Sequence, residues 1–162
     1  MKHQQLNQRE KGQSFLELAV SATFLLILLA GVMDLGRAFF TFTAMRDAVQ
    51  EGASYLAVEP NDCAGAIKRV RQHTSQPVNL EDSGIMVTMT INRYTCTEAA
   101  DSHPPVDTIC PGMDIEATVT MNEFRIATPF LGTLIGGQNF PLTAKVTESV
   151  VVDPDPVSSR CP

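Results

Sequence analysis

One long apolar run dominates the N-terminal third of the chain. No residue between Leu18 and Met33 is charged, and apolar residues continue beyond Asp34 as far as Phe40. The hydrocarbon core of a bilayer is about 30 Å thick, and a helix needs roughly 20 mostly apolar residues to cross it. We therefore expect residues 15–40 to span a membrane. A buried core helix is the alternative.

The helical pattern continues past this run. No proline occurs before Pro60, and apolar residues recur at spacings of three and four, which forms one stripe. The stripe contains Phe39, Phe42, Met45, Val49, Ala53 and Leu56. Residues 13–58 are thus expected to form one helix on the order of 70 Å long, half in lipid and half as the spine of an exported domain. Gly52 interrupts this helix, and either the close approach of another backbone or chance explains it.

The chain beyond Pro60 predicts shorter elements. Asn61 or Asp62 can cap a second helix that runs to about Gln72. Ala66, Ile67 and Val70 form its narrow apolar face.

Three later segments alternate apolar and polar residues, as half-buried strands do. Their inward positions are Ile85, Val87, Met89 and Ile91; then Met113, Ile115, Ala117, Val119 and Met121; then Phe140, Leu142, Ala144 and Val146. We expect the first strand to run from Ile85 to Cys96, with a polar hairpin loop after it. Phe124 and Ile126 either extend the second strand or start another, and Thr128 is a candidate N-cap of a helical turn. The predicted fold class is α+β: a long N-terminal helix packed against a small antiparallel sheet.

The charges that flank the apolar run predict its orientation. Lys2, Arg9 and Lys11 precede the run, whereas the region after it is mixed in sign, so the N-terminus should be cytoplasmic. Residues 1–12 would then be a cytoplasmic leader, residues 13–58 the long helix, and residues 59–162 an exported head.

All four cysteines lie on the exported side, and their even number fits an oxidising compartment. Four cysteines allow three pairings. We expect a hairpin to bring Cys96 opposite Cys110, which leaves Cys63 to pair with Cys161 and to hold a proline-rich tail. Free thiols are the alternative. Because no Cys-x-x-Cys pair occurs, a zinc site is not expected.

Charge and motifs argue against several classes of function. The formal net charge is −6, which gives no electrostatic footprint for nucleic acid. No Gly-x-Ser-x-Gly, His-Glu-x-x-His or phosphate-binding loop occurs. The spacing of Glu98, Asp101, Asp153 and Asp155 does not match a calcium loop. We therefore expect no catalytic residues, no cofactor and no metal.

Glu17 is an acid inside the apolar run. If the chain is cut between Gly12 and Gln13, Glu17 becomes the fifth residue of an apolar helix. The helix dipole favours a carboxylate there by about 0.3–1 kcal/mol, whereas an acid costs roughly 2.5–3.5 kcal/mol at the membrane centre and less near the edge. The α-amino group of a neighbouring copy is a better partner, because one chain's Glu17 would neutralise another chain's N-terminus. An interfacial acid in a plain membrane anchor is the alternative.

A basic leader that ends in glycine, followed by Glu at the fifth position of the cut chain, resembles type IV prepilins. The closest resemblance is to TadE-like pilins of the tight-adherence (Flp) pilus. It rests on the stretches "GQSFLELAV", "DLGRAFFTF", "AVQEGASYLA" and "ATPFLGTLIGGQNFPLTAKVTESV" and covers nearly the whole chain. Asp34 stands where the family more often has Glu, and residues 97–109 and the cysteine-bearing tail match no pattern of the family.

The resemblance implies a pilin-like fold and a filament subunit or assembly-priming minor pilin for surface adhesion. A prepilin peptidase would cut between Gly12 and Gln13. The chain would reside in the cytoplasmic membrane and then, on a pilus assembly platform, join copies of itself or other pilins through its helix. It would end in an extracellular pilus or at the cell surface. Glu17 would act in assembly, and the Asp34–Arg37 pair would lie at the outer membrane boundary and contact a neighbouring helix; an exposed pair is the alternative.

Two other readings remain open. In the first, the chain is an uncleaved single-pass membrane anchor of an exported domain. In the second, it is a secreted protein with an ordinary signal peptide cut near Ala30 or Ala38. The mass of the mature chain distinguishes all three.

Overall fold

The computed structural model describes residues 3–73, 78–81, 84–96, 104, 109–128, 132–133, 136–152 and 161, with side chains from Gln13 onward. It divides into two compact units. The first unit contains Met1–Arg37 and Ile126–Gln138, and the second contains Ala38–Arg125 and Asn139–Pro162.

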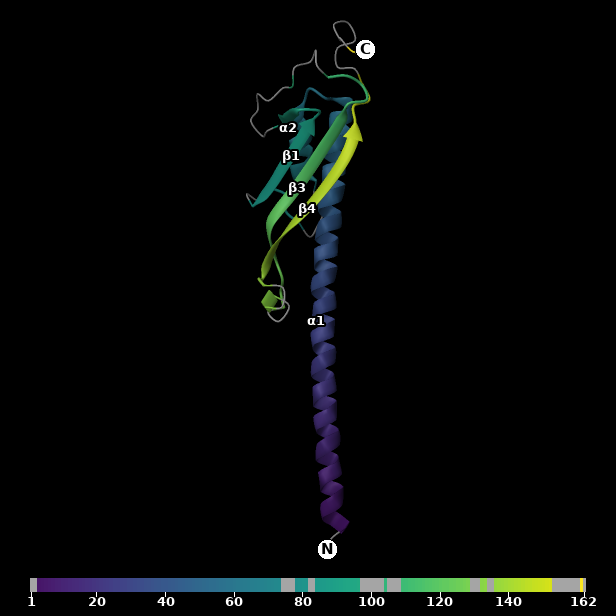
Figure 1. Cartoon of the computed structure of the whole chain (residues 1–162), viewed down its shortest axis with the longest axis vertical. Coiled ribbons are helices and arrows are strands. Elements are labelled where there is room, and N and C mark those ends of the chain that lie inside the picture. Colours follow the sequence, from purple (N-terminus) through teal and green to yellow (C-terminus); the bar gives the residue numbers. More distant parts are fainter. Residues whose placement is uncertain are drawn as a thin grey trace. The chain divides into compact units, whose positions relative to one another are not determined.

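Helix α1, His3–Val58, is the longest element (Figure 1). Its C-terminal end agrees with the prediction, because Pro60 follows closely and the N–H group of Glu59 still donates to the carbonyl of Tyr55 (2.9 Å). Helix α2, Cys63–Gln72, begins after Asp62, whose carboxylate accepts a hydrogen bond from the N–H group of Gly65 (2.8 Å). Asp62 is therefore the N-cap. The apolar face of α2 is buried as predicted, and Cys63 is buried with it.

A four-stranded antiparallel sheet in the order β2-β1-β3-β4 completes the second unit. The strands are β1 (Ile85–Ile91), β2 (Tyr94–Cys96), β3 (Asp114–Arg125) and β4 (Asn139–Ser149). Inward and outward positions alternate as predicted, with Met89, Ile115, Val119 and Ala144 fully buried. The α+β fold class is confirmed.

The first predicted strand is wrong at its end. It does not run from Ile85 to Cys96 but turns at Asn92 and Arg93, so that β2 folds back on β1 with Cys96 opposite Met89. Asn92 has a φ of 54°, a left-handed conformation that asparagine tolerates better than most residues. The loop that follows therefore starts from the far side of β1 rather than from beside β3.

Strand β3 is longer than its alternating core predicts. A register shift between Met121 and Phe124 lets the strand continue to Arg125. The ring centres of Phe124 and Phe140 lie 5.2 Å apart on neighbouring strands. Phe124 therefore extends β3, one of the two outcomes expected. Of the predicted helical turn after Thr128, the structure describes Gly132 and Thr133, both helical, whereas residues 129–131 and 134–135 lie outside the described residues.

The core of the second unit lies between the sheet and residues 38–58 of α1. Met45, Val49, Ala53 and Leu56 are completely buried, as the stripe predicts. The stripe is wrong at its N-terminal end, where Phe39 is 65% and Phe42 is 38% exposed. The sheet does not cover these two rings, so helical spacing alone overestimated the length of the buried face.

Gly52 lies where α2 crosses α1. A Cβ atom built on Gly52 would lie 2.4 Å from Cγ2 of Val70 and 3.1 Å from the carbonyl oxygen of Ala66. A close approach by another backbone, one of the two explanations considered for this glycine, is therefore confirmed.

Both predicted disulfides are wrong. The structure pairs Cys63 with Cys96 and Cys110 with Cys161, with Cα–Cα distances of 5.4 and 5.5 Å. The expected Cys96–Cys110 and Cys63–Cys161 bonds assumed that β1 continued to Cys96. Because the chain turns at Asn92, Cys96 instead meets the start of α2 at Cys63, and Cys110 is left for the tail.

Candidate functional site

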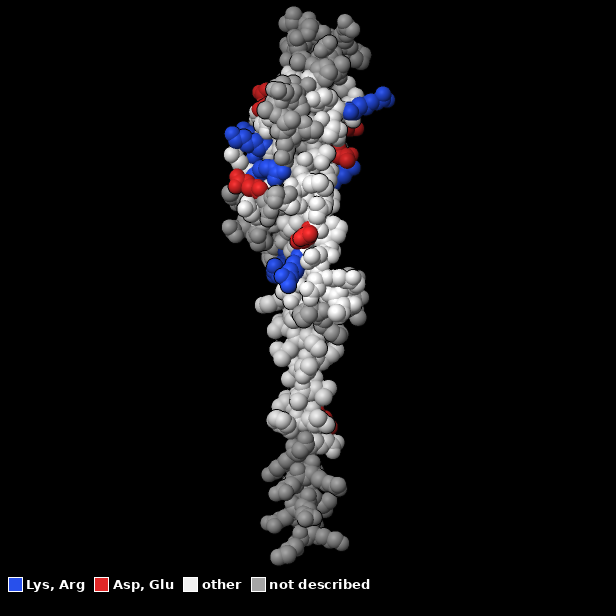
Figure 2. All heavy atoms as spheres, turned by 90° about the vertical axis from the view of Figure 1, so that its left-hand side faces the viewer, with Lys and Arg blue, Asp and Glu red and all other residues white. Residues whose placement is uncertain are grey.

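The apolar N-terminal part of α1 is the first candidate site. The helix is long and apolar enough to cross a membrane, and its most apolar window is wholly unburied in the structure. The exposed fractions of the large apolar side chains between Phe15 and Met33 range from 74% at Phe15 to 42% at Ile27. On the face that Figure 2 shows, charged side chains gather over the second unit and are sparse along this part of the helix. Such a surface needs a cover of lipid or of other apolar helices.

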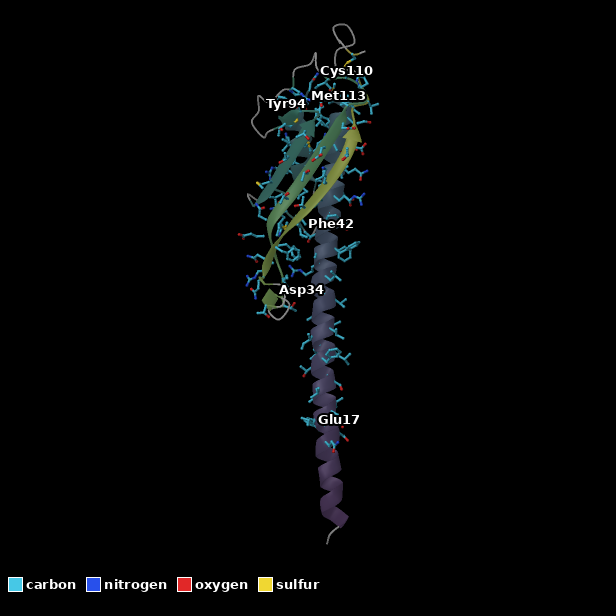
Figure 3. All side chains as sticks on the ribbon, in the orientation of Figure 1. Glu17, Asp34, Phe42, Tyr94, Cys110 and Met113 are labelled. Atoms are coloured by element: carbon cyan, nitrogen blue, oxygen red, sulfur yellow. A yellow bond between two sulfur atoms is a disulfide. The ribbon has the colours of Figure 1, made fainter. Side chains whose placement is uncertain are left out.

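Glu17 lies on this surface. Its side chain is exposed among Phe15, Leu16 and Leu18, which are each at least 65% exposed. Among the described side chains, no hydrogen-bond or ion-pair partner lies against Glu17 (Figure 3). The chain itself therefore supplies no described group that neutralises this acid.

Asp34, the other acid of the apolar helix, is in the opposite situation. It is 7% exposed, and its carboxylate accepts hydrogen bonds from the backbone N–H groups of Ala127 (3.1 Å) and Thr128 (2.8 Å). The hydroxyl of Thr128 donates a further hydrogen bond to the same carboxylate. The guanidinium of Arg37 lies 3.7 Å from it and is 58% exposed. Asp34 thus joins the helix to the segment between β3 and β4, which belongs to the same unit.

This arrangement differs from what the sequence predicts for Asp34. The alternative of an exposed Asp34–Arg37 pair is wrong, because the carboxylate is buried and three hydrogen bonds from its own chain engage it. Arg37 remains on the surface beside it. An effect of Asp34 on neighbouring subunits would therefore act through the segment it holds, and of this pair only Arg37 has a side chain exposed enough for the expected contact with another helix.

The predicted cleavage position, Gly12 and Gln13, lies inside α1. Both residues are α-helical, nine residues or more beyond the first helical residue, His3. The backbone at this bond is therefore wound in the structure. Gly12, Glu17 and Asp34 lie along one helix and are not brought together into one cluster.

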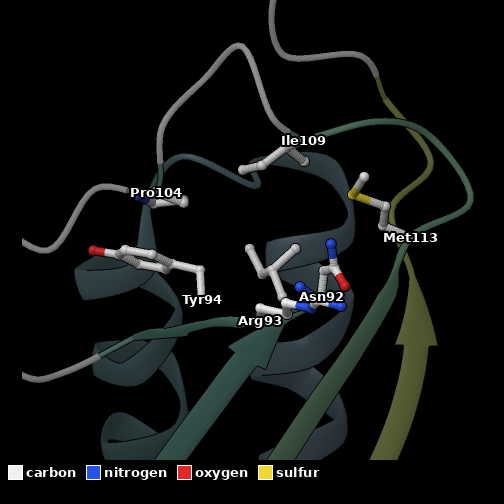
Figure 4. A pocket seen from close by; sticks show the side chains of 7 residues that line it. Asn92, Arg93, Tyr94, Pro104, Ile109 and Met113 are labelled. Atoms are coloured by element: carbon white, nitrogen blue, oxygen red, sulfur yellow. The ribbon is translucent and has the colours of Figure 1, made fainter. Parts of the chain in front are cut away.

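A pocket of about 290 Å³ lies by the hairpin turn of the second unit (Figure 4). Ile91, Ile109 and Met113 form its apolar walls, and Asn92 and Arg93 supply polar groups. Among the residues that line it, no carboxylate, histidine, serine or cysteine is available to pair as acid, base or nucleophile. Within the described ranges, no group of three or more histidine, cysteine or acidic residues could hold a metal ion.

Sequence reasoning found both acids but missed the partner of Asp34. Thr128 lies 94 residues further along the chain and was assigned only to a helical turn. The absence of any charge between Ile126 and Gln138 is the sequence signal that could have drawn attention to this segment.

Residues 12–54 match the family model of TadE-like proteins. No curated protein and no solved structure matches the chain. The matched region covers Gly12, Glu17, Asp34 and Arg37 and most of α1. Together with the apolar helix, the match suggests a pilin-like protein associated with the Tad pilus, with membrane anchoring and a location in a pilus or at the cell surface. The N-terminal helix of the chain is thus similar to that of TadE-like proteins.

Proposed function

We propose that the chain is a pilin-like subunit, either a filament subunit or a minor pilin that primes assembly. A prepilin peptidase removes residues 1–12, and the mature chain waits in the cytoplasmic membrane with its head exported. An assembly platform then moves it into a filament used for surface adhesion, where its N-terminal helix packs against other copies or other pilins.

The exposed state of the helix carries this proposal. From Phe15 to Met33 the described helix offers apolar side chains on all its faces, with Glu17 as the only charge in that range. Lipid can cover the apolar surface, but it cannot satisfy a carboxylate. A bundle of helices satisfies both, because the new α-amino group at Gln13 of one subunit can pair with Glu17 of another.

Substitution of Glu17 tests the assembly step. Glu17→Gln keeps the size of the side chain and removes the charge, so we expect normal cleavage and membrane insertion but little or no incorporation into sheared filaments. Ser21→Ala, one turn further along the same exposed surface, is the matched control and should assemble normally. Incorporation of Glu17→Gln at the wild-type level would contradict the proposed charge pairing.

A plain membrane anchor is the second candidate. The observation that favours it is the uninterrupted helix from His3 onward, because an uncut α1 would form a regular single-pass span. An anchor would retain residues 1–12 and would be unaffected by Glu17→Gln. The two measurements therefore separate the candidates.

A further inference from the structure

The segment between β3 and β4 carries no charged residue from Ile126 to Gln138. It belongs to the same compact unit as Met1–Arg37 of α1. Asp34, which holds this segment, directly follows the last residue of the uncharged run, Met33. If α1 spans a membrane through that run, the segment lies at the level where the helix leaves the hydrocarbon (Figure 3).

Several backbone N–H groups among the described residues of the segment find partners within the first unit. The N–H groups of Ala127 and Thr128 donate to Asp34, and that of Ile126 donates to the carbonyl of Gln138 (2.8 Å). The N–H group of Gly132 donates to the carbonyl of Thr128 (3.3 Å), and that of Gly137 to the carbonyl of Gly132 (2.8 Å). Irregular backbone can approach the hydrocarbon edge of a membrane more closely when its polar groups already have such partners, because the bilayer core offers no water to replace them.

These observations lead to a second membrane contact. We propose that the described residues of this segment, 126–128, 132–133 and 136–138, lie in the outer interfacial layer of the bilayer beside α1, and that Asp34 is the positioning residue that holds them there. The proposal rests on the membrane stage of the proposed function. Its partner is the lipid of the membrane that α1 spans.

The exposed hairpin turn between β1 and β2 lacks this combination. The hairpin turn between β1 and β2 carries Arg93, which is exposed. A charged side chain is costly at the edge of the hydrocarbon unless it can reach the headgroups or water. The segment held by Asp34 contains no charged residue. The carboxylate of Asp34 that faces this segment is buried and accepts hydrogen bonds from it. A neighbouring helix in the filament is the rival partner for the same surface.

Tryptophan fluorescence can test this placement, because the chain contains no tryptophan. Thr133 is exposed and belongs to the segment, so Thr133→Trp in the purified mature chain provides a single reporter. The chain is placed in phosphatidylcholine vesicles whose acyl chains are brominated close to the headgroup. We expect bromine to quench the fluorescence of this tryptophan. We also expect the emission maximum of the tryptophan to lie at a shorter wavelength than that of a tryptophan exposed to water.

Two matched reporters calibrate the signal. Leu26→Trp lies in the apolar run and should be quenched strongly, whereas Ser54→Trp lies on the exposed side of α1 in the second unit and should not be quenched. Quenching at Leu26→Trp with none at Thr133→Trp would overturn the second membrane contact and would favour the neighbouring helix as partner. Quenching at neither position would contradict the membrane stage of the proposed function itself.

Asp34→Asn, combined with Thr133→Trp, tests the positioning role. An amide can accept at only one atom and presents an N–H group to the donors of Ala127 and Thr128. Quenching at position 133 should therefore fall toward the value of Ser54→Trp, while quenching of Leu26→Trp in the same Asp34→Asn background stays unchanged. Undiminished quenching at position 133 would show that Asp34 does not hold the segment at the membrane.

Discussion

At the scale of single residues, the two acids of the apolar helix illustrate one rule. A carboxylate in an apolar setting has to find donors or a positive charge, since burial of an unpaired charge is costly. Asp34 finds its donors in its own chain, through Ala127 and Thr128. Glu17 has none among the described side chains, and the partner proposed for it is the α-amino group of another subunit. The same chemical group, a carboxylate, is thus satisfied within the chain at Asp34 and, in the proposed function, is available for assembly at Glu17.

Tyr55 shows how a single hydrogen bond fixes α2 on α1. Its hydroxyl donates to the carboxylate of Asp62 (2.7 Å), and the guanidinium of Arg69 lies 4.2 Å from the centre of its ring. We expect Tyr55→Phe to lower the free energy of unfolding by roughly 1.5 kcal/mol, because the bond to a charged acceptor is lost. Denaturant unfolding of the mature chain in detergent measures this, and Tyr94→Phe is a control outside this interaction. An unchanged midpoint would contradict the assigned role.

The same tyrosine predicts a dependence on pH. The hydrogen bond to Asp62, together with burial and the nearby negative charge, raises the pKa of Tyr55 above its ordinary value of 10.0. The unfolded chain then ionises first, so the stability that Tyr55 contributes is fully present below pH 10 and is lost as pH rises through the folded pKa. The difference in unfolding free energy between wild type and Tyr55→Phe should stay constant below that pH and shrink above it. A difference that grows above it would contradict the sign of the shift.

Gly52 is a residue whose side chain is excluded by packing. Gly52→Ala gains about 1 kcal/mol of helix propensity, but its Cβ atom would meet Val70 at 2.4 Å. Overpacking of a filled core typically costs about 1–3 kcal/mol, so we expect a net loss of stability. Gly36→Ala is the control, since nothing lies within 4 Å of a Cβ atom built there. The melting temperature of Gly52→Ala should fall, and that of Gly36→Ala should not.

At the scale of elements, the sequence predicts what is periodic and misses what is not. The end of α1, the span of α2 and the alternation of β1, β3 and β4 follow from local patterns that repeat over many residues. The turn at Asn92 does not, because Ile91-Asn92-Arg93-Tyr94 lacks glycine and proline. The only mark of the break is Arg93, a charged residue at a position that the alternation would place inward. That one missed turn displaced Cys96 and so reversed both disulfide assignments. The Asp34–Thr128 contact was equally out of reach, because no local pattern links residues so far apart.

The corrected disulfides predict a defined set of crosslinked peptides. Non-reducing peptide mapping should join Cys63 to Cys96 and Cys110 to Cys161. Removal of the first bond by Cys63→Ser with Cys96→Ser should cost about 2–4 kcal/mol of unfolding free energy, because the start of α2 is then no longer tied to β2. The pair Cys110→Ser with Cys161→Ser, which removes the second bond, is the comparison. A peptide that joins Cys96 to Cys110 would contradict the turn at Asn92.

At the scale of the whole molecule, the decisive quantity is the mass of the mature chain. Helix α1 continues from His3 through the bond between Gly12 and Gln13, so the proposed peptidase would have to unwind this part of the helix before it could cut. Glycine eases that unwinding by about 1 kcal/mol relative to alanine, and it leaves room around an extended backbone.

We therefore expect intact-mass measurement to show loss of residues 1–12, and Gly12→Leu to accumulate as the full-length chain in the membrane. Gln8→Leu, in the leader but away from the bond, is the matched control and should mature normally. Loss of about thirty to forty residues would instead indicate a signal peptide, and no loss would indicate a plain anchor. Leucine is bulky and favours the helix, so it should hinder both the unwinding and the fit of the backbone in the peptidase. Normal maturation of Gly12→Leu would therefore contradict the need for glycine at this position.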